Sequence, residues 1–232
     1  MIRESKHIVH AALLLIVLII FLPMTAAGHM LVVDPGHGGS DTGVALSRSV
    51  DEKDVTLNIA RHIKKKLSGV NGIDIRLTRL DDRDVSIEDR KKIVEKLNAD
   101  LFISLHVNAG FGQNAEGYEI YSSSLIVPSA KESNSKEIVE NMEQTAYLND
   151  SVRFGQIVQK NIRKIFPRKG RGLRDAPIFI LKSLKTPAIL MEIGFATNVN
   201  DKKLLRDEKM QEDIADVLTK SVQEYFSTGG AS

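Results

Sequence analysis

Three polar side chains stand at apolar runs of strand length, where the strand ends of an α/β sheet gather functional groups. His37 follows one run in the loop VVDPGHGGSDTG, which holds four glycines. His106 lies in FISLHVNA, with Ser104 and Asn108 on the same alternating face. Glu192 lies in PAILMEIGF, where a buried carboxylate is very costly unless it pairs, takes up a proton or meets a metal. Burial would also raise its pKa toward the value that a general acid or base needs.

These residues also have plain structural interpretations. A histidine in a glycine loop is most often structural, and a strand histidine is more often hydrogen-bonded in the core. Glu52 in SVDEKDVTLNIA is a fourth candidate. An acid ahead of a helix complements the helix dipole, however, and Asp51 and Asp54 would serve equally well. The residue types alone do not prefer Glu52 to these neighbours.

Two histidines and one carboxylate would suit zinc, which accepts imidazole nitrogen and carboxylate oxygen and leaves a fourth position to water. The metal lowers the pKa of that water and polarises a carbonyl, while a second carboxylate that is not a ligand moves the proton. There is no HExxH motif, and the candidates are dispersed along the chain, so spacing does not select the ligands. The residues themselves predict an exported α/β protein with a His/His/Glu site for a metal.

Composition narrows the classes of protein that the chain can belong to. Its 232 residues include 32 basic and 30 acidic side chains, for a formal net charge of +2. A dedicated nucleic-acid binder would show a stronger basic excess, so we expect no nucleic-acid partner. The chain has no cysteine, which excludes disulfides, thiolate metal ligands and a cysteine nucleophile.

The first 29 residues have the order of an export signal. A basic start, MIRESKHIVH, is followed by an uncharged apolar run over residues 11–24 and by the small residues TAAG. Cleavage after Ala27 and an uncleaved membrane anchor both remain open. In either case we expect the domain, residues 30–228, to be exported to the periplasm or cell wall, with membrane contact only through this leader.

The remainder of the chain alternates between strand and helix patterns. Apolar runs of strand length occur at 31–33, 73–77, 101–107, 118–121, 178–181 and 188–193. Helical spacing of apolar residues occurs at 55–67, 87–97, 154–165 and 210–225. This alternation predicts one α/β domain whose sheet is covered by helices on both faces. A polar insert, residues 122–150, interrupts the pattern as a surface helix, a lid or a disordered segment.

Four sequence motifs give information on function that the spacing of the residues does not give. VVDPGHGGSDTG, DEKDVTLNIA, ADLFISLHVNA and PAILMEIGFATNVND stand in this order. Together they resemble the zinc-dependent N-acetylmuramoyl-L-alanine amidases of bacteria, over residues 31–226. The resemblance implies a twisted sheet of about six strands flanked by helices. It also implies hydrolysis of the amide between the lactyl group of N-acetylmuramic acid and L-alanine of the peptidoglycan stem peptide, in cell-wall remodelling or cell separation.

The resemblance also implies roles for single residues. His37, Glu52 and His106 correspond to the ligands of one zinc ion, and Glu192 corresponds to the catalytic glutamate that shuttles the proton of the attacking water. Candidates for substrate contact form a second group: Asn108, Arg171 and Arg174. The two arginines could meet carboxylates of the stem peptide, or they could be ordinary surface charges.

The insert at 122–150 falls where some members of this family carry a segment that occludes the zinc until an activator protein moves it. Its acids Glu137, Glu140 and Glu143 have helical spacing, and one of them could fill the open zinc position. A solvated surface helix is the alternative. We expect a monomer. No wall-binding repeat is recognisable, so localisation to the wall would rest on the leader, an anchor or a partner.

Two other functions remain open at this point. A binding protein could hold peptidoglycan around a structural zinc, although Glu192 would then have no use. A zinc peptidase could cut within the stem peptide, and only the family resemblance argues against it.

Overall fold

The computed structural model describes residues 28–110, 112–123, 135–166 and 170–229. The predicted leader, residues 1–29, lies outside this part of the chain except for its last two residues. None of the described helices is both long enough and apolar enough to cross a membrane.

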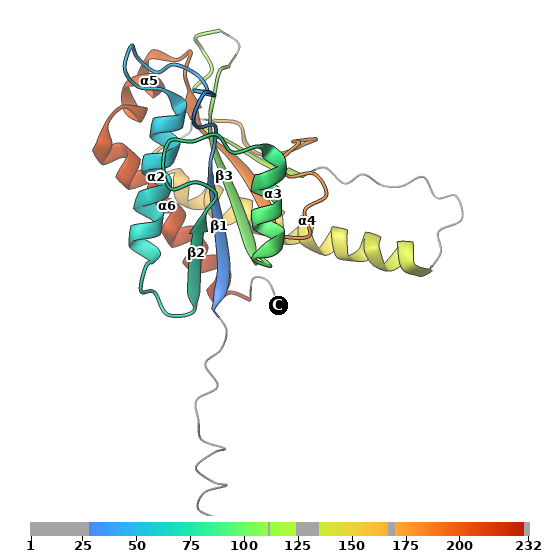
Figure 1. The fold of residues 1–232 in the computed structure, drawn as a ribbon. Coiled ribbons are helices and arrows are strands. Elements are labelled where there is room, and N and C mark those ends of the chain that lie inside the picture. Colours follow the sequence, from blue (N-terminus) through green and yellow to red (C-terminus); the bar gives the residue numbers. More distant parts are fainter. Residues whose placement is uncertain (1–27, 111, 124–134, 167–169, 230–232) are drawn as a thin grey trace, which may run out of the picture.

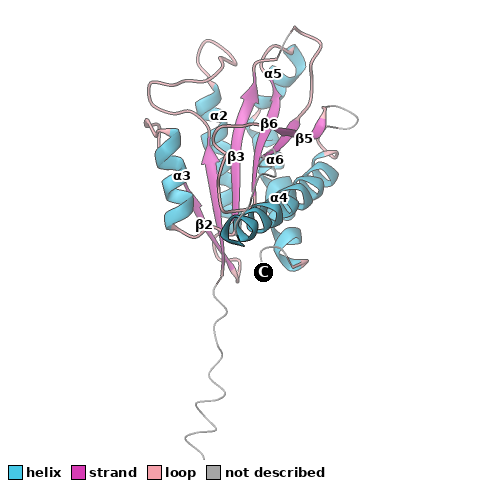
Figure 2. Ribbon diagram, turned by 90° about the vertical axis from the view of Figure 1, so that its right-hand side faces the viewer, coloured by secondary structure: helices cyan, strands magenta, loops and turns pink. Residues whose placement is uncertain are grey.

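Six strands form one mixed sheet in the order β2-β1-β3-β6-β4-β5 (Figures 1 and 2). The strands are β1 (His29–Pro35), β2 (Ile73–Leu77), β3 (Leu101–Asn108), β4 (Glu119–Ser123), β5 (Gly172–Ala176) and β6 (Ala188–Phe195). β2, β1, β3 and β6 pair in parallel, whereas β4 runs antiparallel to β6 and parallel to β5. The predicted α/β sheet of about six strands is confirmed. The antiparallel step brings the start of β4 to the edge where β3 and β6 end.

Five helices surround the sheet: α2 (Glu52–Leu67), α3 (Ile87–Lys96), α4 (Ser135–Ile162), α5 (Val199–Leu205) and α6 (Glu208–Ser227). α2, α6 and the second half of α4 cover one face, while α3 and the segment 178–187 cover the other. The four-residue spacing that predicted α2 is fully used, because Val55, Ile59, Ile63 and Leu67 are all buried. Helices on both faces were expected from the sequence and are present.

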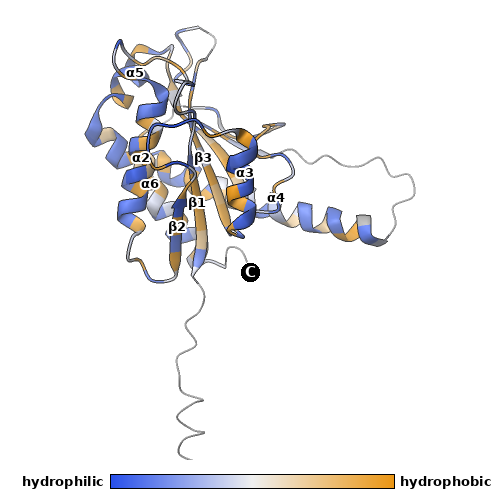
Figure 3. Ribbon diagram, in the orientation of Figure 1, coloured by the Kyte–Doolittle hydropathy of each residue, from blue (hydrophilic) through white to orange (hydrophobic). Residues whose placement is uncertain are grey.

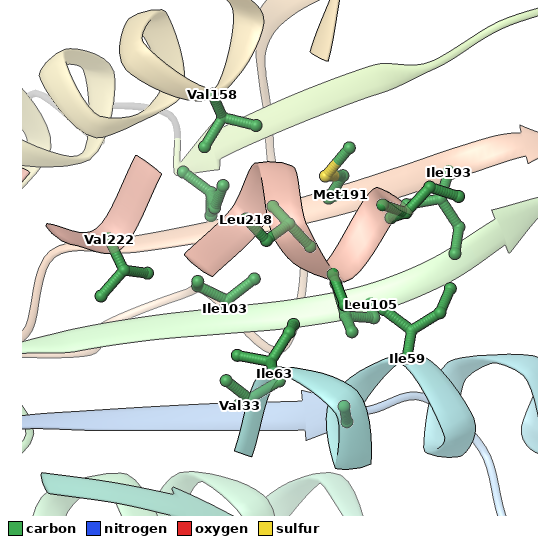
Figure 4. Packing of buried hydrophobic residues seen from close by; sticks show 14 of the residues in the cluster. Val33, Ile59, Ile63, Ile103, Leu105, Val158, Met191, Ile193, Leu218 and Val222 are labelled. Atoms are coloured by element: carbon green, nitrogen blue, oxygen red, sulfur yellow. The ribbon is translucent and has the colours of Figure 1, made fainter. Parts of the chain in front are cut away.

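The main core lies between the sheet and α2, α4 and α6. Figure 4 shows the α6 side chains Leu218 and Val222 and the α2 side chain Ile63 packed around Ile103 and Val33 of the sheet. Full burial of such side chains stabilises a fold by about 1.5–3 kcal/mol each. Figure 3 shows hydrophobic residues along β1 and β3, whereas hydrophobic and hydrophilic residues alternate along the helices. This core fixes the strand ends that carry the site.

One predicted strand is wrong. Residues 178–181 form turns, with the Leu181 N–H donating to the carbonyl of Ile178, and they bury Ile180 and Leu181 against the second face of the sheet. The fifth strand is instead β5, whose sequence GLRDA gave no apolar run. β5 is an edge strand in which only Gly172 is buried, so burial imposed no strand pattern on its sequence.

The insert at 122–150 is divided between three parts. Residues 122 and 123 belong to β4, residues 124–134 lie outside the described chain, and residues 135–150 form the first half of α4. Figure 1 shows this half running out from the body of the domain, and Ile138, Val139 and Met142 are exposed on it. Of the three alternatives that the sequence left open, residues 135–150 form a surface helix.

Candidate active site

The three predicted metal ligands converge at the end of β1 and β3. Glu52 Oε1 lies 3.0 Å from His37 Nε2 and 3.1 Å from His106 Nδ1, and the two histidine nitrogens are 3.2 Å apart. Ligand atoms around a four-coordinate zinc lie about 3.3 Å apart when the metal bonds are about 2.0 Å long. The three donors therefore fit a small tetrahedral cation without rearrangement. Within the described residues this is the one group of histidines and acids close enough to bind a metal.

Glu52 reaches the site because its neighbours take over the capping of α2. The Asp54 carboxylate accepts a 3.0 Å hydrogen bond from the backbone N–H of Asp51, ahead of the first helical residue. Glu52 is turned inward instead and is buried, and its carboxylate accepts from the N–H groups of Val44 at 3.0 Å and Val107 at 2.8 Å. These two bonds tie its carboxylate to the loop before α2 and to β3. The structure therefore distinguishes Glu52 from the two acids that the residue types left equivalent.

Two glycines let the backbone approach the ligands. A Cβ at Gly43 would lie 2.5 Å from Glu52 Oε2, and a Cβ at Gly36 would lie 2.5 Å from the ring carbon Cε1 of His106. Both distances are far too short for any side chain. His37 itself has a φ of 59°, a left-handed conformation that is uncommon outside glycine and often marks a functional site. The glycine-rich loop thus makes room for the ligands.

The buried Arg79 joins the His37 loop to the start of α2. Its Nε donates to the carbonyl of Pro35 at 3.0 Å, and its Nη2 donates to the carbonyls of Gly36 and Lys53, each at 2.8 Å. The two backbone segments that carry His37 and Glu52 are therefore held by one guanidinium.

A second buried guanidinium, that of Arg90, holds the other side of the loop. It pairs with the fully buried Asp34 at 2.5 Å and donates to the carbonyls of Pro35 at 2.8 Å and His37 at 2.6 Å. Neither arginine was singled out from the sequence, because TRLDDRD and EDRKK have the composition of ordinary charged surface.

Neighbouring side chains shift the pKa values of His37 and Glu52 when no cation is bound. Burial alone would lower the pKa of His37, but its hydrogen bonds and charge interactions with Glu52 and then with Asp41 raise it to about 9. Burial would raise the pKa of Glu52, and the bonds to His106 and His37 lower it to about 2. Asp41 Oδ2 lies 2.8 Å from His37 Nδ1, which leaves Nε2 to face Glu52 and His106. A carboxylate on the outer nitrogen is the usual way to orient a metal-binding histidine.

Glu192 stands on the strand next to His106. The two residues are direct partners in the parallel pairing of β3 and β6, so their side chains leave the same face of the sheet. The Glu192 atom Oε2 is buried and has no hydrogen-bond partner among the described residues. Burial, and then the carboxylates of Glu52 and Glu119, raise the pKa of Glu192 to about 7, although the charge of His106 opposes the shift. A carboxylate with this pKa can both accept and return a proton near neutral pH.

Comparison with known proteins shows the family of the chain. The family profile described as N-acetylmuramoyl-L-alanine amidase matches residues 31–224. The chain belongs to this amidase family. It is 29% identical to N-acetylmuramoyl-L-alanine amidase AmiA of Escherichia coli K12 over 220 residues, which cover 85% of this chain and 76% of AmiA.

Solved amidases share the fold. The N-acetylmuramoyl-L-alanine amidase from Clostridium difficile 630 superposes with a TM-score of 0.73 at 28% identity and covers 88% of this chain and 100% of its own. The CwlD amidase from Clostridioides difficile, solved in complex with the GerS lipoprotein, has a TM-score of 0.70 at 28% identity and covers 87% and 100%. The chain is accordingly a hydrolase of the amidase class, with a His/Glu/His group able to hold a metal.

In this amidase the three predicted substrate residues gather around a fourth residue, Glu119. Asn108 Nδ2 donates to Glu119 Oε2 at 2.8 Å, while Arg171 Nε and Arg174 Nη1 lie 3.2 and 3.7 Å from Glu119 Oε1. The side chains of both arginines remain about half exposed. They are therefore not isolated surface charges, because both are paired with a buried carboxylate.

Glu119 was missed in the sequence although a signal was present. It stands in GYEIYSS, within the predicted strand 118–121, as an acid in an otherwise apolar or aromatic run. The same reasoning that singled out Glu192 applies to it. Asp41 was missed for a different reason, since an acid in a glycine-rich loop is common and carries no burial signal.

Among the acids of the insert whose side chains the structure describes, none lies at the metal ligands. Within the described side chains, the group close enough to share a cation contains His37, Glu52 and His106 alone. Glu140 is exposed and lies 3.9 Å from Lys136 on the same helix, and Glu143 is also exposed. The side chain of Glu137 lies outside the described residues. In this conformation neither Glu140 nor Glu143 fills the open metal position.

Proposed function

We propose that the chain is a zinc-dependent enzyme that hydrolyses the amide between the lactyl group of N-acetylmuramic acid and L-alanine of the peptidoglycan stem peptide. The observation that carries the proposal is the pairing of Glu192 with His106 across β6 and β3. This pairing places the Glu192 carboxylate, whose pKa is raised to about 7, beside three ligand atoms that are spaced for a tetrahedral cation. A protein that only bound peptidoglycan would have no use for that carboxylate.

The chemistry divides between the cation and the chain. A zinc ion bound by His37, Glu52 and His106 supplies Lewis acidity toward water and the scissile carbonyl. The Glu192 carboxylate takes one proton from the attacking water as the new carbon–oxygen bond forms. As the carbon–nitrogen bond breaks, Glu192 returns this proton to the nitrogen of the leaving L-alanine. The products are a lactyl carboxylic acid and a stem peptide with a free amine, so atoms and charge balance.

Other side chains keep this arrangement fixed during the reaction. Asp41 holds the His37 ring in the orientation in which Nε2 faces the cation. The buried Arg79 and Arg90 hold the backbone of the same loop. Such preorganisation saves the energy of assembling the site for each turnover.

We also propose that this activity serves wall remodelling or cell separation in the periplasm or cell wall, and that the leader 1–29 exports or anchors the chain. A protein partner acting on the insert 122–150 is part of this proposal. It is supported by the solved complex of the related CwlD with a lipoprotein. Deleting the insert is expected to raise the basal activity and to abolish the response to such a partner, and unchanged or lost activity would contradict this part of the proposal.

The experiment uses the full chain, purified in detergent, loaded with zinc and incubated with peptidoglycan, with and without a chelator. Mass spectrometry should find stem peptides that begin with a free L-alanine amine and glycan strands without peptide, and the chelator should abolish both products. Glu192→Gln should keep zinc and fold but lose turnover by at least about 100-fold. Fragments cut within the stem peptide would instead indicate a zinc peptidase. Binding without any product would indicate a binding protein.

A further inference from the structure

Glu119 is a buried carboxylate that the proposed reaction does not use. It is the first residue of β4 and pairs directly with Glu192 across the antiparallel β4–β6 ladder, while Glu192 pairs with His106 across β6 and β3. The three side chains therefore form one row across three neighbouring strands and project from the same face. The row runs from the metal ligand through the proposed base to Glu119.

The two oxygens of the Glu119 carboxylate have different surroundings. Oε2 accepts hydrogen bonds of 2.8 Å from Asn108 Nδ2 and from the hydroxyl of Tyr121. Oε1 is buried, has no hydrogen bond of good geometry within the described chain, and lies 3.2 Å from Arg171 Nε and 3.7 Å from Arg174 Nη1. One oxygen thus fixes the carboxylate in place, and the other faces two cationic side chains.

The guanidinium groups of Arg171 and Arg174 are paired with Glu119 and still have N–H donors free for a ligand. Glu119 is 1% exposed, whereas the side chains of Arg171 and Arg174 are 56% and 45% exposed. A guanidinium has five N–H donors in a planar fork, so one ion pair leaves most of them free to bind an oxyanion. A long arginine side chain also loses substantial rotamer entropy when it binds a ligand, and a fixed ion pair removes part of that cost beforehand. Two arginines beside one carboxylate leave a net positive charge at this end of the row.

The far end of the row matches the chemistry of the substrate. The scissile amide carries no charge, but the stem peptide that continues beyond L-alanine carries carboxylates, which in many peptides are free and in others are amidated. Arginine pairs recognise carboxylates through two parallel hydrogen bonds. An amide in the same place offers one acceptor and two donors, and the donors would point at cations.

We propose that Glu119 is a positioning residue that holds Arg171 and Arg174 to receive a carboxylate of the stem peptide, so that the enzyme prefers free over amidated stems. The inference rests on the proposed hydrolysis and adds a substrate preference to it. Glu119 acts through the arginines and touches no reacting atom. Arg171 enters this arrangement just before β5, and Arg174 stands on β5 opposite Tyr121.

The test compares two synthetic muropeptides that have the same glycan and peptide and differ only at the residue after L-alanine, whose carboxylate is free in one and amidated in the other. The zinc-loaded full chain should cleave the free form with a kcat/KM at least about tenfold higher, as expected for charged hydrogen bonds. Glu119→Gln should raise KM for the free form by about tenfold, leave kcat nearly unchanged, and affect the amidated form little.

Arg171→Gln and Arg174→Gln should each reduce the same preference, and adding Glu119→Gln to Arg174→Gln should cost less than it does in the wild-type chain. Because both arginines are half-exposed, we expect their variants to fold. These variants therefore test the carboxylate preference even if Glu119→Gln fails to fold. Glu224→Gln, which removes a carboxylate paired with Lys160 far along α6, is the matched control and should leave the preference intact.

Two results would overturn the proposal. A wild-type enzyme that cleaves both muropeptides equally well has no carboxylate preference to explain. If Glu119→Gln lowers kcat by the same factor on both muropeptides, Glu119 only supports the fold and does not set a substrate preference. If the wild-type chain cleaves neither muropeptide nor peptidoglycan, it is the proposed hydrolysis that fails, which is a distinguishable outcome.

Discussion

The guanidinium of Arg90 joins the buried Asp34 to the backbone carbonyl of His37, with bonds of 2.5 and 2.6 Å. Arg90 neutralises the buried carboxylate of Asp34 and at the same time holds the loop that carries the candidate ligand His37. Asp34 also accepts from the hydroxyls of Thr78 and Ser104, so its carboxylate is bonded from α3, from β3 and from the residue that follows β2. We therefore expect this one ion pair to link the stability of the fold to the binding of a metal.

Arg90→Gln is expected to destabilise the protein by about 3–5 kcal/mol, because it leaves the carboxylate of Asp34 buried without its cation. It should also weaken zinc binding, since the His37 carbonyl loses its donor. Urea unfolding and chelator competition measure the two effects. Arg61→Gln removes an exposed arginine that donates to the carbonyl of Leu80 and should change both by little. Equal losses in the two variants would refute the link.

Gly43→Ala tests the space around the ligands. Gly43 and Gly69 both have positive φ, 65° and 88°, so an alanine at either carries backbone strain of roughly 1–2 kcal/mol. A Cβ at Gly43 would meet the Glu52 carboxylate at 2.5 Å, whereas a Cβ at Gly69 would meet nothing within 4 Å. We expect Gly43→Ala to lose zinc affinity while Gly69→Ala keeps it. Isothermal calorimetry with zinc compares them, and unchanged affinity in Gly43→Ala would contradict the crowding argument.

Asp41→Asn should lower zinc affinity by roughly 10–100-fold, the usual cost of removing a carboxylate behind a metal-binding histidine. The fold should be preserved, because the side chain of Asp41 is largely exposed. Competition with a fluorescent chelator gives the affinity. Asp213→Asn removes an exposed acid that pairs with Lys209 on α6, and it should bind zinc normally. If both variants bind alike, Asp41 does not orient the ligand.

Zinc binding should release at least about one proton at pH 7. His37 has a pKa of about 9 before the cation binds and is therefore protonated at neutral pH, and a cation on Nε2 must displace that proton. Calorimetry in two buffers of different ionisation enthalpy gives the number released. The number should fall as the pH rises through 9. A binding heat independent of the buffer at pH 7 would contradict this assignment.

The same shifts predict how the chelated protein responds to pH. The raised pKa values of His37 and Glu192, about 9 and about 7, contribute stability at low pH that is lost as the pH rises through those values. The lowered pKa of Glu52, about 2, contributes stability above its ordinary value that is lost on acidification toward pH 2. Thermal unfolding with chelator should therefore show maximal stability at about pH 4.5 to 5, a decline toward pH 7 as Glu192 ionises, and a further decline from pH 6.5 to 9 as His37 loses its proton. Zinc should flatten the loss above pH 6.5, and an unchanged profile would count against the ligand set.

The sequence predicted those parts of the fold and site that obey a local rule. Apolar spacing predicted α2 and α6, and period-two alternation put Ser104, His106 and Asn108 on one face of β3, where the structure has them. The ligand set needed the family motifs, because His37, Glu52 and His106 are far apart in the chain. Their proximity follows from sheet order, which no local pattern encodes.

The missed features share a physical cause. β5 pairs only at the sheet edge and buries little, so its residues were not selected for alternation. The segment 178–181 was apolar because it covers the sheet as a set of turns, and burial does not distinguish a turn from a strand. Glu119 gained its meaning from the antiparallel step at β4, which places it beside Glu192.

The direction of β1 sets the distance between the start of the domain and the metal ligands. The chain enters the domain at His29 and arrives at the metal ligands only after Pro35, so the strand separates the two by about 20 Å. Figure 1 shows the entry at the opposite end of the sheet from the loops that follow β1 and β3. If the leader holds the chain in a bilayer, the metal ligands lie at the end of the domain that is farther from the point where the leader joins it. An anchored enzyme of this shape would trim wall strands at a fixed standoff, and the length of chain before β1 would set how deep into the wall it can cut.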